Sequence, residues 1–233
     1  MEAIVRNLCT VLSVLLLAAF AAFAGGKEEK DESITVEAAD LRKINCGNLV
    51  YAANQTSVCF ADAFLRKAAQ ETRLSIAPHF VRVPLDTAEA FDFPFCVFSG
   101  EGTFRLTQPQ RDNFRRYILG GGFILASPGC SDAEWNKSFL TEMKLIFPDY
   151  TLQKIPMDNS IFSVVHKITE LHDKEGKRVL VEGLLVNGRV ALVYSVEGLN
   201  DVEKAKGCCC CGGNEIMESR VLNVNILTYA LLY

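Results

Sequence analysis

Short apolar runs alternate with amphipathic stretches along most of the chain. This alternation is typical of an α/β domain, in which helices connect the strands of a largely parallel sheet. The runs are short enough for strands and are bounded by Gly, Pro, Asn or Ser. The strands are predicted at 49–53, 80–83, 95–98 and 123–126.

Apolar residues with helical spacing follow the first, third and fourth of these strands. Ser57 is expected to cap the first helix, whose apolar face is Phe60, Phe64, Leu65 and Ala68. Two capping boxes, at 107–110 and 131–134, predict the next two helices. The inward face of the second of these is expected to carry Trp135, Phe139, Leu140, Met143 and Phe147.

The end of the chain departs from this alternation. After a less regular stretch at 150–178, two apolar runs at 179–185 and 189–195 flank Asn187-Gly188, a strong hairpin signal. A last helix is predicted from Asn214 to Leu232. We therefore expect a doubly wound, mostly parallel sheet with a late antiparallel hairpin.

The length and composition fit one α/β domain or two small ones. The chain has 233 residues, of which 49% are hydrophobic and 22% charged, so it can bury a substantial core and is too apolar to be disordered. The formal net charge of −4 argues against a nucleic-acid-binding surface, which needs clustered positive charge.

The first 24 residues have the features of a secretory signal peptide. Arg6 precedes an apolar run at 8–22, and Ala22-Phe23-Ala24 matches a cleavage site before Gly25. The run has about 15 residues, short of the ~20 that a membrane-spanning helix needs. We predict export to the periplasm or the medium, no stable membrane span after cleavage, a charged linker at 25–45 and a single domain at 46–233. A protein partner in the cell envelope is one expectation for such a domain.

Export determines how the cysteines are interpreted. Of nine cysteines, Cys9 leaves with the signal peptide, and the remaining eight favour disulfides in an oxidising compartment. Cys46 is expected at the amino edge of the sheet and Cys96 in the core. The run Cys208–Cys211 pairs poorly with itself, because adjacent Cα atoms are 3.8 Å apart, below the usual disulfide minimum.

The special residues lie where strands end, which is where open α/β sheets bind ligands. Candidate ligand-binding residues are Asn54, Thr56 and Ser57 after the first strand, Ser99, Gly100 and Glu101 after the third, and Ser127 after the fourth. The metal or disulfide candidates are Cys59, Cys130, Cys208, Cys209, Cys210 and Cys211.

Three interpretations of this cysteine group remain open. Disulfides that staple loops are the default in an exported protein. Thiolates of Cys130 and the run could instead hold a soft metal, Zn²⁺ or Cu(I). Alternatively, Cys130 at a strand-to-helix turn could be the nucleophile of a hydrolase or amidase, with Glu101 as a general acid. We favour a non-catalytic binding module over the enzyme.

Four separated motifs carry a resemblance to a known family. They lie at 93–102, 114–123, 155–162 and 224–231. Over about residues 48–233 the chain resembles the bacterial domain-of-unknown-function 4159 family. The resemblance implies a flavodoxin-like fold similar to class I glutamine amidotransferases, without their catalytic apparatus. In the family pattern a histidine often stands between two glycines where this chain has Glu101.

Overall fold

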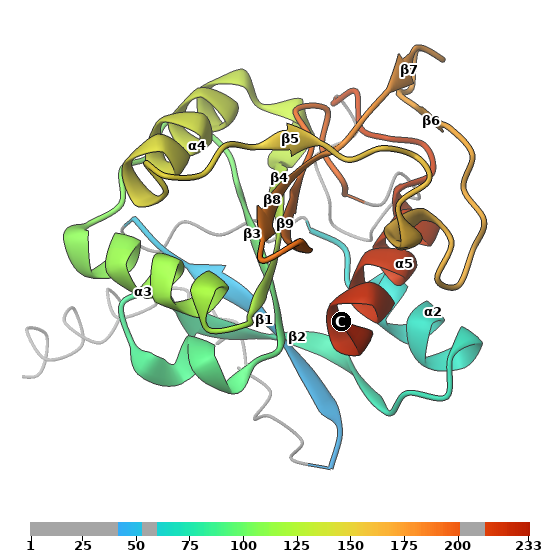
Figure 1. Cartoon of the computed structure of the whole chain (residues 1–233), viewed down its shortest axis with the longest axis horizontal. Coiled ribbons are helices and arrows are strands. Elements are labelled where there is room, and N and C mark those ends of the chain that lie inside the picture. Colours follow the sequence, from blue (N-terminus) through green and yellow to red (C-terminus); the bar gives the residue numbers. More distant parts are fainter. Residues whose placement is uncertain (1–41, 53–59, 201–212) are drawn as a thin grey trace, which may run out of the picture. The chain divides into compact units, whose positions relative to one another are not determined.

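The computed structural model describes residues 42–52, 60–200 and 213–233. Within them the chain forms two sheets, four helices and short 3₁₀ turns (Figure 1). The helices are α2 (Ala63–Glu71), α3 (Gln108–Leu119), α4 (Ala133–Ile146) and α5 (Ser219–Leu232). The strands are β1 (Ile44–Val50), β2 (Ile76–Pro84), β3 (Phe95–Gly100), β4 (Phe123–Pro128), β5 (Gln153–Lys154), β6 (Leu171–His172), β7 (Arg178–Val179), β8 (Glu182–Val186) and β9 (Arg189–Tyr194).

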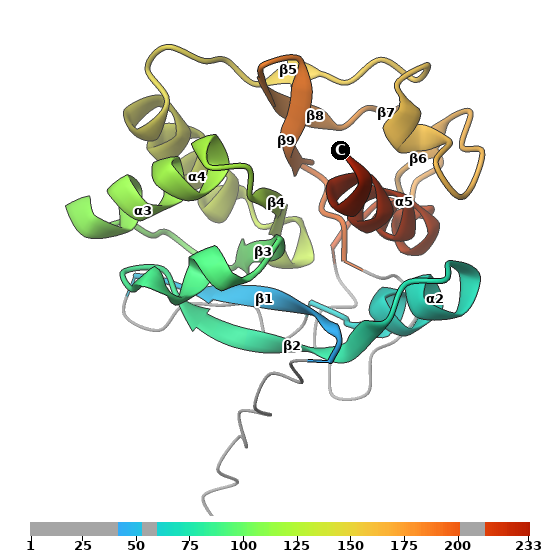
Figure 2. The same ribbon diagram turned by 60° about the horizontal axis from the view of Figure 1, so that its bottom comes forward.

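The main sheet confirms the predicted fold class. Its strand order is β2-β1-β3-β4-β9-β8-β5, and the first five strands are parallel neighbours. The strands β8 and β5 are antiparallel to their neighbours, and β6 pairs with β7 in a separate two-stranded sheet. Helices α3 and α4 cover one face of the main sheet, and α2 and α5 cover the other (Figure 2). The fold is therefore a doubly wound α/β sheet.

Two short sequence signals predicted local structure correctly. The capping box of α3 is confirmed, since Thr107 accepts from Gln110 N and the Gln110 side chain accepts from Thr107 N. The late hairpin is confirmed too, with φ of +52° at Asn187 and +80° at Gly188, the left-handed pair of a tight hairpin turn.

The predicted capping box of α4 is wrong. The helix is capped by Asp132, whose side chain accepts from Trp135 N at 2.7 Å. Ser131 cannot serve as the cap because its hydroxyl is hydrogen-bonded to Glu197 O and Asn214 N instead. A tertiary contact thus displaced the helix start by one residue.

Two other predicted helix starts are also wrong. The helix after β1 begins at Ala63 and not near Ser57, and α5 begins at Ser219 and not at Asn214. Residues before α5 are held by other partners: Ile216 pairs with Asp173 in an isolated β-bridge. Consequently the cysteine run does not directly precede a helix.

Cys46 lies in β1, which begins five residues before the predicted strand. Its side chain is completely buried in the core, so the expected position at the edge of the sheet is wrong. Cys96 is completely buried as predicted. Burial raises the pKa of both thiols, that of Cys96 to about 12. The two point to opposite faces of the sheet and are free thiols.

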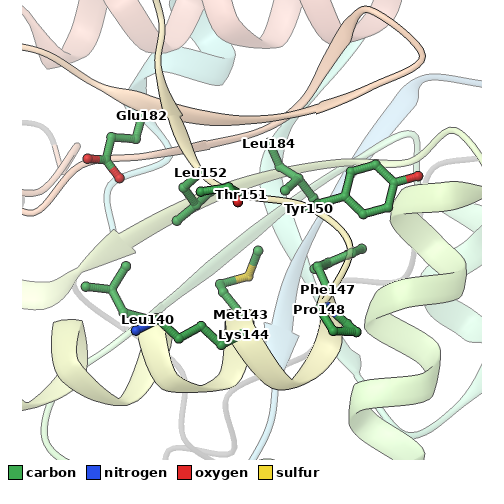
Figure 3. A pocket seen from close by; sticks show the side chains of 10 residues that line it. All are labelled: Leu140, Met143, Lys144, Phe147, Pro148, Tyr150, Thr151, Leu152, Glu182 and Leu184. Atoms are coloured by element: carbon green, nitrogen blue, oxygen red, sulfur yellow. The ribbon is translucent and has the colours of Figure 1, made fainter.

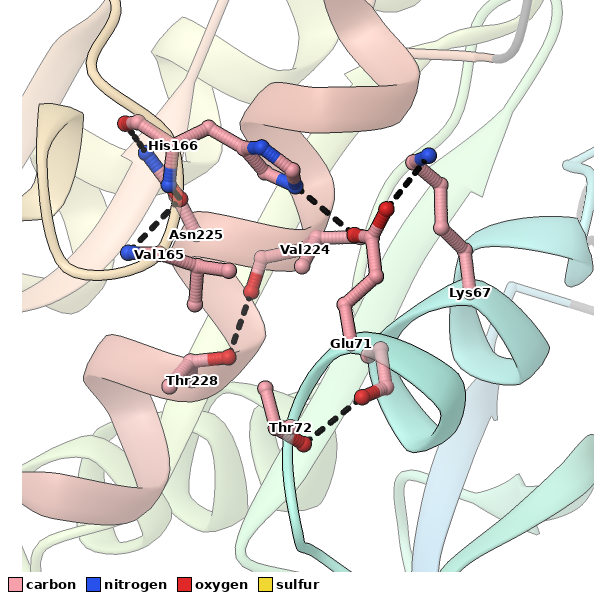
Figure 4. Close-up of polar contacts among 9 residues, drawn as sticks. Lys67, Glu71, Thr72, Val165, His166, Val224, Asn225 and Thr228 are labelled. Carbon is pink, nitrogen blue, oxygen red and sulfur yellow. Dashed lines mark hydrogen bonds and ion pairs between the residues drawn. The ribbon is translucent and has the colours of Figure 1, made fainter.

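Helix α2 is tied to the segment that packs against α5 (Figure 4). Glu71 accepts from Lys67 Nζ and contacts His166 Nε2, each at 2.7 Å. Lys67 is the main cause, and His166 a further one, of a lowered pKa of Glu71, while partial burial opposes the shift. Asn225 of α5 accepts from the backbone N–H of Val165 and His166. These contacts hold α2 and α5 over one face of the sheet.

Across the described ranges we found no helix with the length and apolarity required to cross a membrane.

Candidate functional site

The carboxyl ends of β3 and β4 bring together part of the predicted site. Ser99 and Ser127 are register partners on these neighbouring strands, and both are completely buried. Glu101 follows β3 and Cys130 follows β4. The other candidates lie outside the described residues: Asn54, Thr56, Ser57, Cys59, Cys208, Cys209, Cys210 and Cys211.

Two aromatic side chains, Trp135 and Tyr51, pack against the carboxyl end of β3. Trp135 Nε1 donates to Tyr51 Oη at 2.6 Å, and Tyr51 Oη donates to Ser99 O at 3.1 Å. A side chain at Gly100 would collide with the Tyr51 hydroxyl. Burial raises the pKa of Tyr51, so the hydroxyl stays protonated and acts as a fixed hydrogen-bonding group. Glycine at position 100 is therefore required for packing.

Glu101 lies over the turn that carries Cys130. A Cβ atom at Gly129 would be 2.7 Å from Glu101 Cγ and 2.8 Å from its Oε1. The absence of a side chain at position 129 lets the Glu101 side chain lie directly on this turn. Glu101 and Cys130, predicted as separate candidates from different strand ends, are thus neighbours on one surface.

The turn after β4 has an uncommon backbone. Cys130 has φ +49° and ψ +33°, and Ser131 has φ +56°. Both residues are therefore in the left-handed region, which costs a non-glycine residue about 1–2 kcal/mol. Such conformations persist only where the surroundings over-determine them, and they concentrate at functional sites.

Two segments from later in the chain hold this turn. Ser131 Oγ donates to Glu197 O and accepts from Asn214 N, the latter at 2.6 Å. Gly213 packs directly on the turn, because a Cβ there would lie 2.6 Å from Cys130 Cα. The residues after β9 and before α5 thus clamp Cys130 and Ser131 in place.

A polar network connects the segment before α5, which holds the turn, to the loop after β6. Lys174 Nζ donates to Gly213 O at 2.8 Å and forms an ion pair with the buried Glu215 at 2.5 Å. Asn214 Nδ2 donates to Asp173 Oδ2 at 3.0 Å. Burial alone would raise the pKa of Asp173, but hydrogen bonds from two backbone N–H groups and from Asn214 lower it.

The sequence interpretation missed this network entirely. Its members come from the loop after β6 and the segment before α5. None belongs to a spacing motif, and charged residues in loops usually lie in solvent. The one signal in the sequence is the glycine pair at 212–213, which allows a close approach of the backbone but does not identify its partner.

The three histidines each contact a carboxylate. His79 Nδ1 lies 2.6 Å from Asp62, His166 Nε2 lies 2.7 Å from Glu71, and His172 Nδ1 lies 3.2 Å from Glu218. The acidic side chains nearest the Cys130 turn are instead Glu101, which lies against Gly129, and Glu215, which lies against Gly213.

The arrangement offers one soft metal ligand, a sulfur, and one hard metal ligand, a carboxylate oxygen. Cys130 supplies a partly exposed sulfur atom, and Glu101 supplies a carboxylate. Among the described residues, no three histidine, cysteine, aspartate or glutamate side chains are grouped as a metal site. Cys130 and Glu101 could contribute two ligands to a metal or contact a small polar molecule.

Comparison with known proteins places most of the chain in one family. The family model described as "Domain of unknown function (DUF4159)" matches residues 47–231. The match covers all nine strands and the four helices almost to their ends. A search of curated proteins finds no match to this chain.

Proposed function

The chain belongs to this family of domains of unknown function, and we propose that it is an exported binding domain whose ligand site lies at Cys130 and Glu101. The observation that carries the proposal is the clamped left-handed turn at Cys130 and Ser131. Helix α4 is already capped by Asp132, so the helix start does not require this backbone. Its cost is better explained by the need to present the thiol beside the carboxylate.

The cysteine run adds to this proposal through covalent connectivity. Cys211 precedes Gly213 by two residues, and two peptide units span at most about 7 Å. Because Gly213 packs on the backbone of Cys130, this short covalent link supports the proposal that the run can reach the Cys130 turn. Cys130 could then share a Zn²⁺ or Cu(I) ion with the run, or form a disulfide with one of its members.

Metal content and thiol state on one sample test the proposal. The protein is purified from the periplasm without reductant, and zinc and copper are measured by elemental analysis. The same sample is alkylated and mapped by mass spectrometry. A soft-metal site predicts about one ion per chain, lost in Cys130→Ser and when Cys208 to Cys211 become serine, but kept in Cys96→Ala.

The two ligand states give different results. No metal together with a Cys130 peptide cross-linked to the run would establish the disulfide. A metal-free protein in which Cys130 is alkylated as readily as in the unfolded chain would refute both forms of the proposal.

A cysteine-dependent hydrolase is the second candidate. A strained strand-to-helix turn is also how α/β-hydrolases expose a nucleophile, and Glu101 is the adjacent acid–base group. This function predicts that iodoacetamide modifies Cys130 faster in the native protein than in the unfolded chain. It also predicts that Glu101→Gln slows this modification. A slower reaction in the native protein would exclude the enzyme.

Export is part of the same proposal and is tested separately. It rests on the apolar run at 8–22 and the Ala-Phe-Ala sequence at 22–24, which lie outside the described residues. Amino-terminal sequencing of the protein recovered from the periplasm or medium should begin at Gly25. An intact amino terminus on protein that stays in the cytoplasm would show that the segment is not a signal peptide.

A further inference from the structure

A second concave site lies between α4 and β8, with a cavity of about 370 Å³ (Figure 3). Neither Cys130 nor Glu101 lines it, so it is distinct from the site proposed above. Its floor is formed by Met143 of α4, by Phe147 directly after this helix and by Leu184 of β8, all of which are buried. The volume is in the range of small-ligand pockets, which are mostly apolar with a few placed polar groups.

Leu140 marks one end of this pocket. The sequence pattern placed Leu140 in the core, and this prediction is wrong, because 38% of the residue is exposed. The rings of Phe147 and Tyr150 lie at the opposite end (Figure 3). An apolar group of a ligand would therefore contact apolar side chains along the length of the pocket.

Charged groups are concentrated at the Leu140 end. The ammonium group of Lys144 and the carboxylate of Glu182 both lie there (Figure 3). Within the part of the chain that the structure describes, neither side chain takes part in an ion pair. Lys154 is directly opposite Glu182 across β5 and β8 and adds a second positive charge. This end therefore offers separate partners for a carboxylate and for an ammonium group.

We propose that this pocket binds a small zwitterion with an apolar body, which is the chemistry of a free apolar α-amino acid. The carboxylate of the ligand pairs with Lys144 and its ammonium group pairs with Glu182. Its side chain occupies the apolar interior between α4 and β8. Charge-assisted hydrogen bonds at one end and apolar burial at the other together fix the orientation of the ligand.

Isothermal titration calorimetry with a matched ligand series tests the charge pattern. L-phenylalanine and L-leucine are titrated at up to about 10 mM, which covers a millimolar Kd. 3-Phenylpropionate lacks the ammonium group, 2-phenylethylamine lacks the carboxylate, and L-serine lacks the apolar body. We expect both apolar amino acids to bind at one per chain and each of the three analogues to bind about tenfold more weakly or not at all.

Variants at the pocket test its location. Leu140→Trp should fill the Leu140 end and abolish binding, whereas Leu145→Trp, on the same helix but not lining the pocket, should not. Glu182→Gln should weaken L-phenylalanine about tenfold and leave any binding of 3-phenylpropionate unchanged. Lys144→Met should weaken binding of the amino acid as much as Glu182→Gln does. Lys137→Met, on the same helix but away from the pocket, is the control and should not weaken it.

Three results would overturn the inference. One is that no apolar amino acid binds to the folded wild-type protein, whose state is checked by circular dichroism. Another is that 3-phenylpropionate binds as tightly as L-phenylalanine, since the site would then select an anion and not a zwitterion. The last is that Leu140→Trp binds as well as Leu145→Trp, which would place the ligand elsewhere.

Discussion

Replacing Cys130 with glycine and with alanine tests directly whether the turn after β4 is strained. Both variants remove the thiol, but only glycine adopts φ +49° without a steric cost. Removing the steric cost of the left-handed conformation should raise the free energy of unfolding of the glycine variant by about 1–2 kcal/mol. The greater freedom of glycine in the unfolded chain should lower the free energy of unfolding by about 0.4–1 kcal/mol. We therefore expect the free energy of unfolding of Cys130→Gly to exceed that of Cys130→Ala by about 1 kcal/mol.

Urea denaturation and thermal unfolding measure this difference. A gain of about 1 kcal/mol corresponds to a Tm higher by about 2–4 °C in a domain of this size. The matched control is Lys137 on the exposed side of α4, where glycine should be less stable than alanine by about 0.5–1 kcal/mol. If Cys130→Gly is no more stable than Cys130→Ala, the turn is not strained and the observation that carries the proposed function fails.

Three further predictions concern the rest of the domain. Glu142→Ala should lower the free energy of unfolding by about 3–5 kcal/mol in urea, because it leaves the largely buried Arg111 without its bidentate partner; a loss below about 1 kcal/mol would contradict this. The lowered pKa of Glu71 stabilises the fold above the ordinary value of 4.5 and stops doing so as the pH falls through the lower folded value. Glu71→Gln should therefore cost up to about 1 kcal/mol at neutral pH and nothing in acid, and an equal cost at both would be inconsistent. Cys46 and Cys96 should react with iodoacetamide only after denaturation, and modification of either in the native protein would contradict their burial.

The fold was predictable from the sequence where local signals and tertiary packing agree. The capping box of α3 and the Asn187-Gly188 turn form within a few residues of chain, and both occur as predicted. The parallel direction of β1 to β4 followed from the alternation of strands with helices, since crossover connections keep strands parallel, whereas the strand order was not predicted.

Predictions failed where a distant residue competes for a local group. The hydroxyl of Ser131 has the spacing of a helix cap, but Glu197 and Asn214 bind it, and α4 starts one residue later. Cys46 was placed outside the first strand because polar Asn45, Gly47 and Asn48 interrupt the apolar pattern around it. Its burial depends on the pairing of β1 with β2 and β3, which no local pattern records.

The candidate site was predictable only in part, for the same reason. Because Glu101 and Cys130 each follow a strand, we predicted that both lie at one edge of the sheet. The Glu101 side chain lies against Gly129, the neighbour of Cys130, in agreement with that prediction. The left-handed turn and its clamp depend on segments about 66 and 83 residues further along the chain. Spacing motifs cannot detect contacts of that kind, because they compare only neighbouring positions.

The late hairpin has a consequence for both proposed sites. A parallel connection brings a helix that covers one face of the sheet, whereas the two-residue turn between β8 and β9 brings none. On the α4 face, no helix therefore covers the sheet beside β8. The cavity lies there, next to residues 147–152 and the exposed Leu140. The same hairpin returns β9 parallel to β4, so that the chain after β9 emerges beside Cys130 and supplies Glu197 to the clamp. The antiparallel pair of β8 and β9 thus leaves the apolar pocket without a covering helix and completes the polar site at the carboxyl edge.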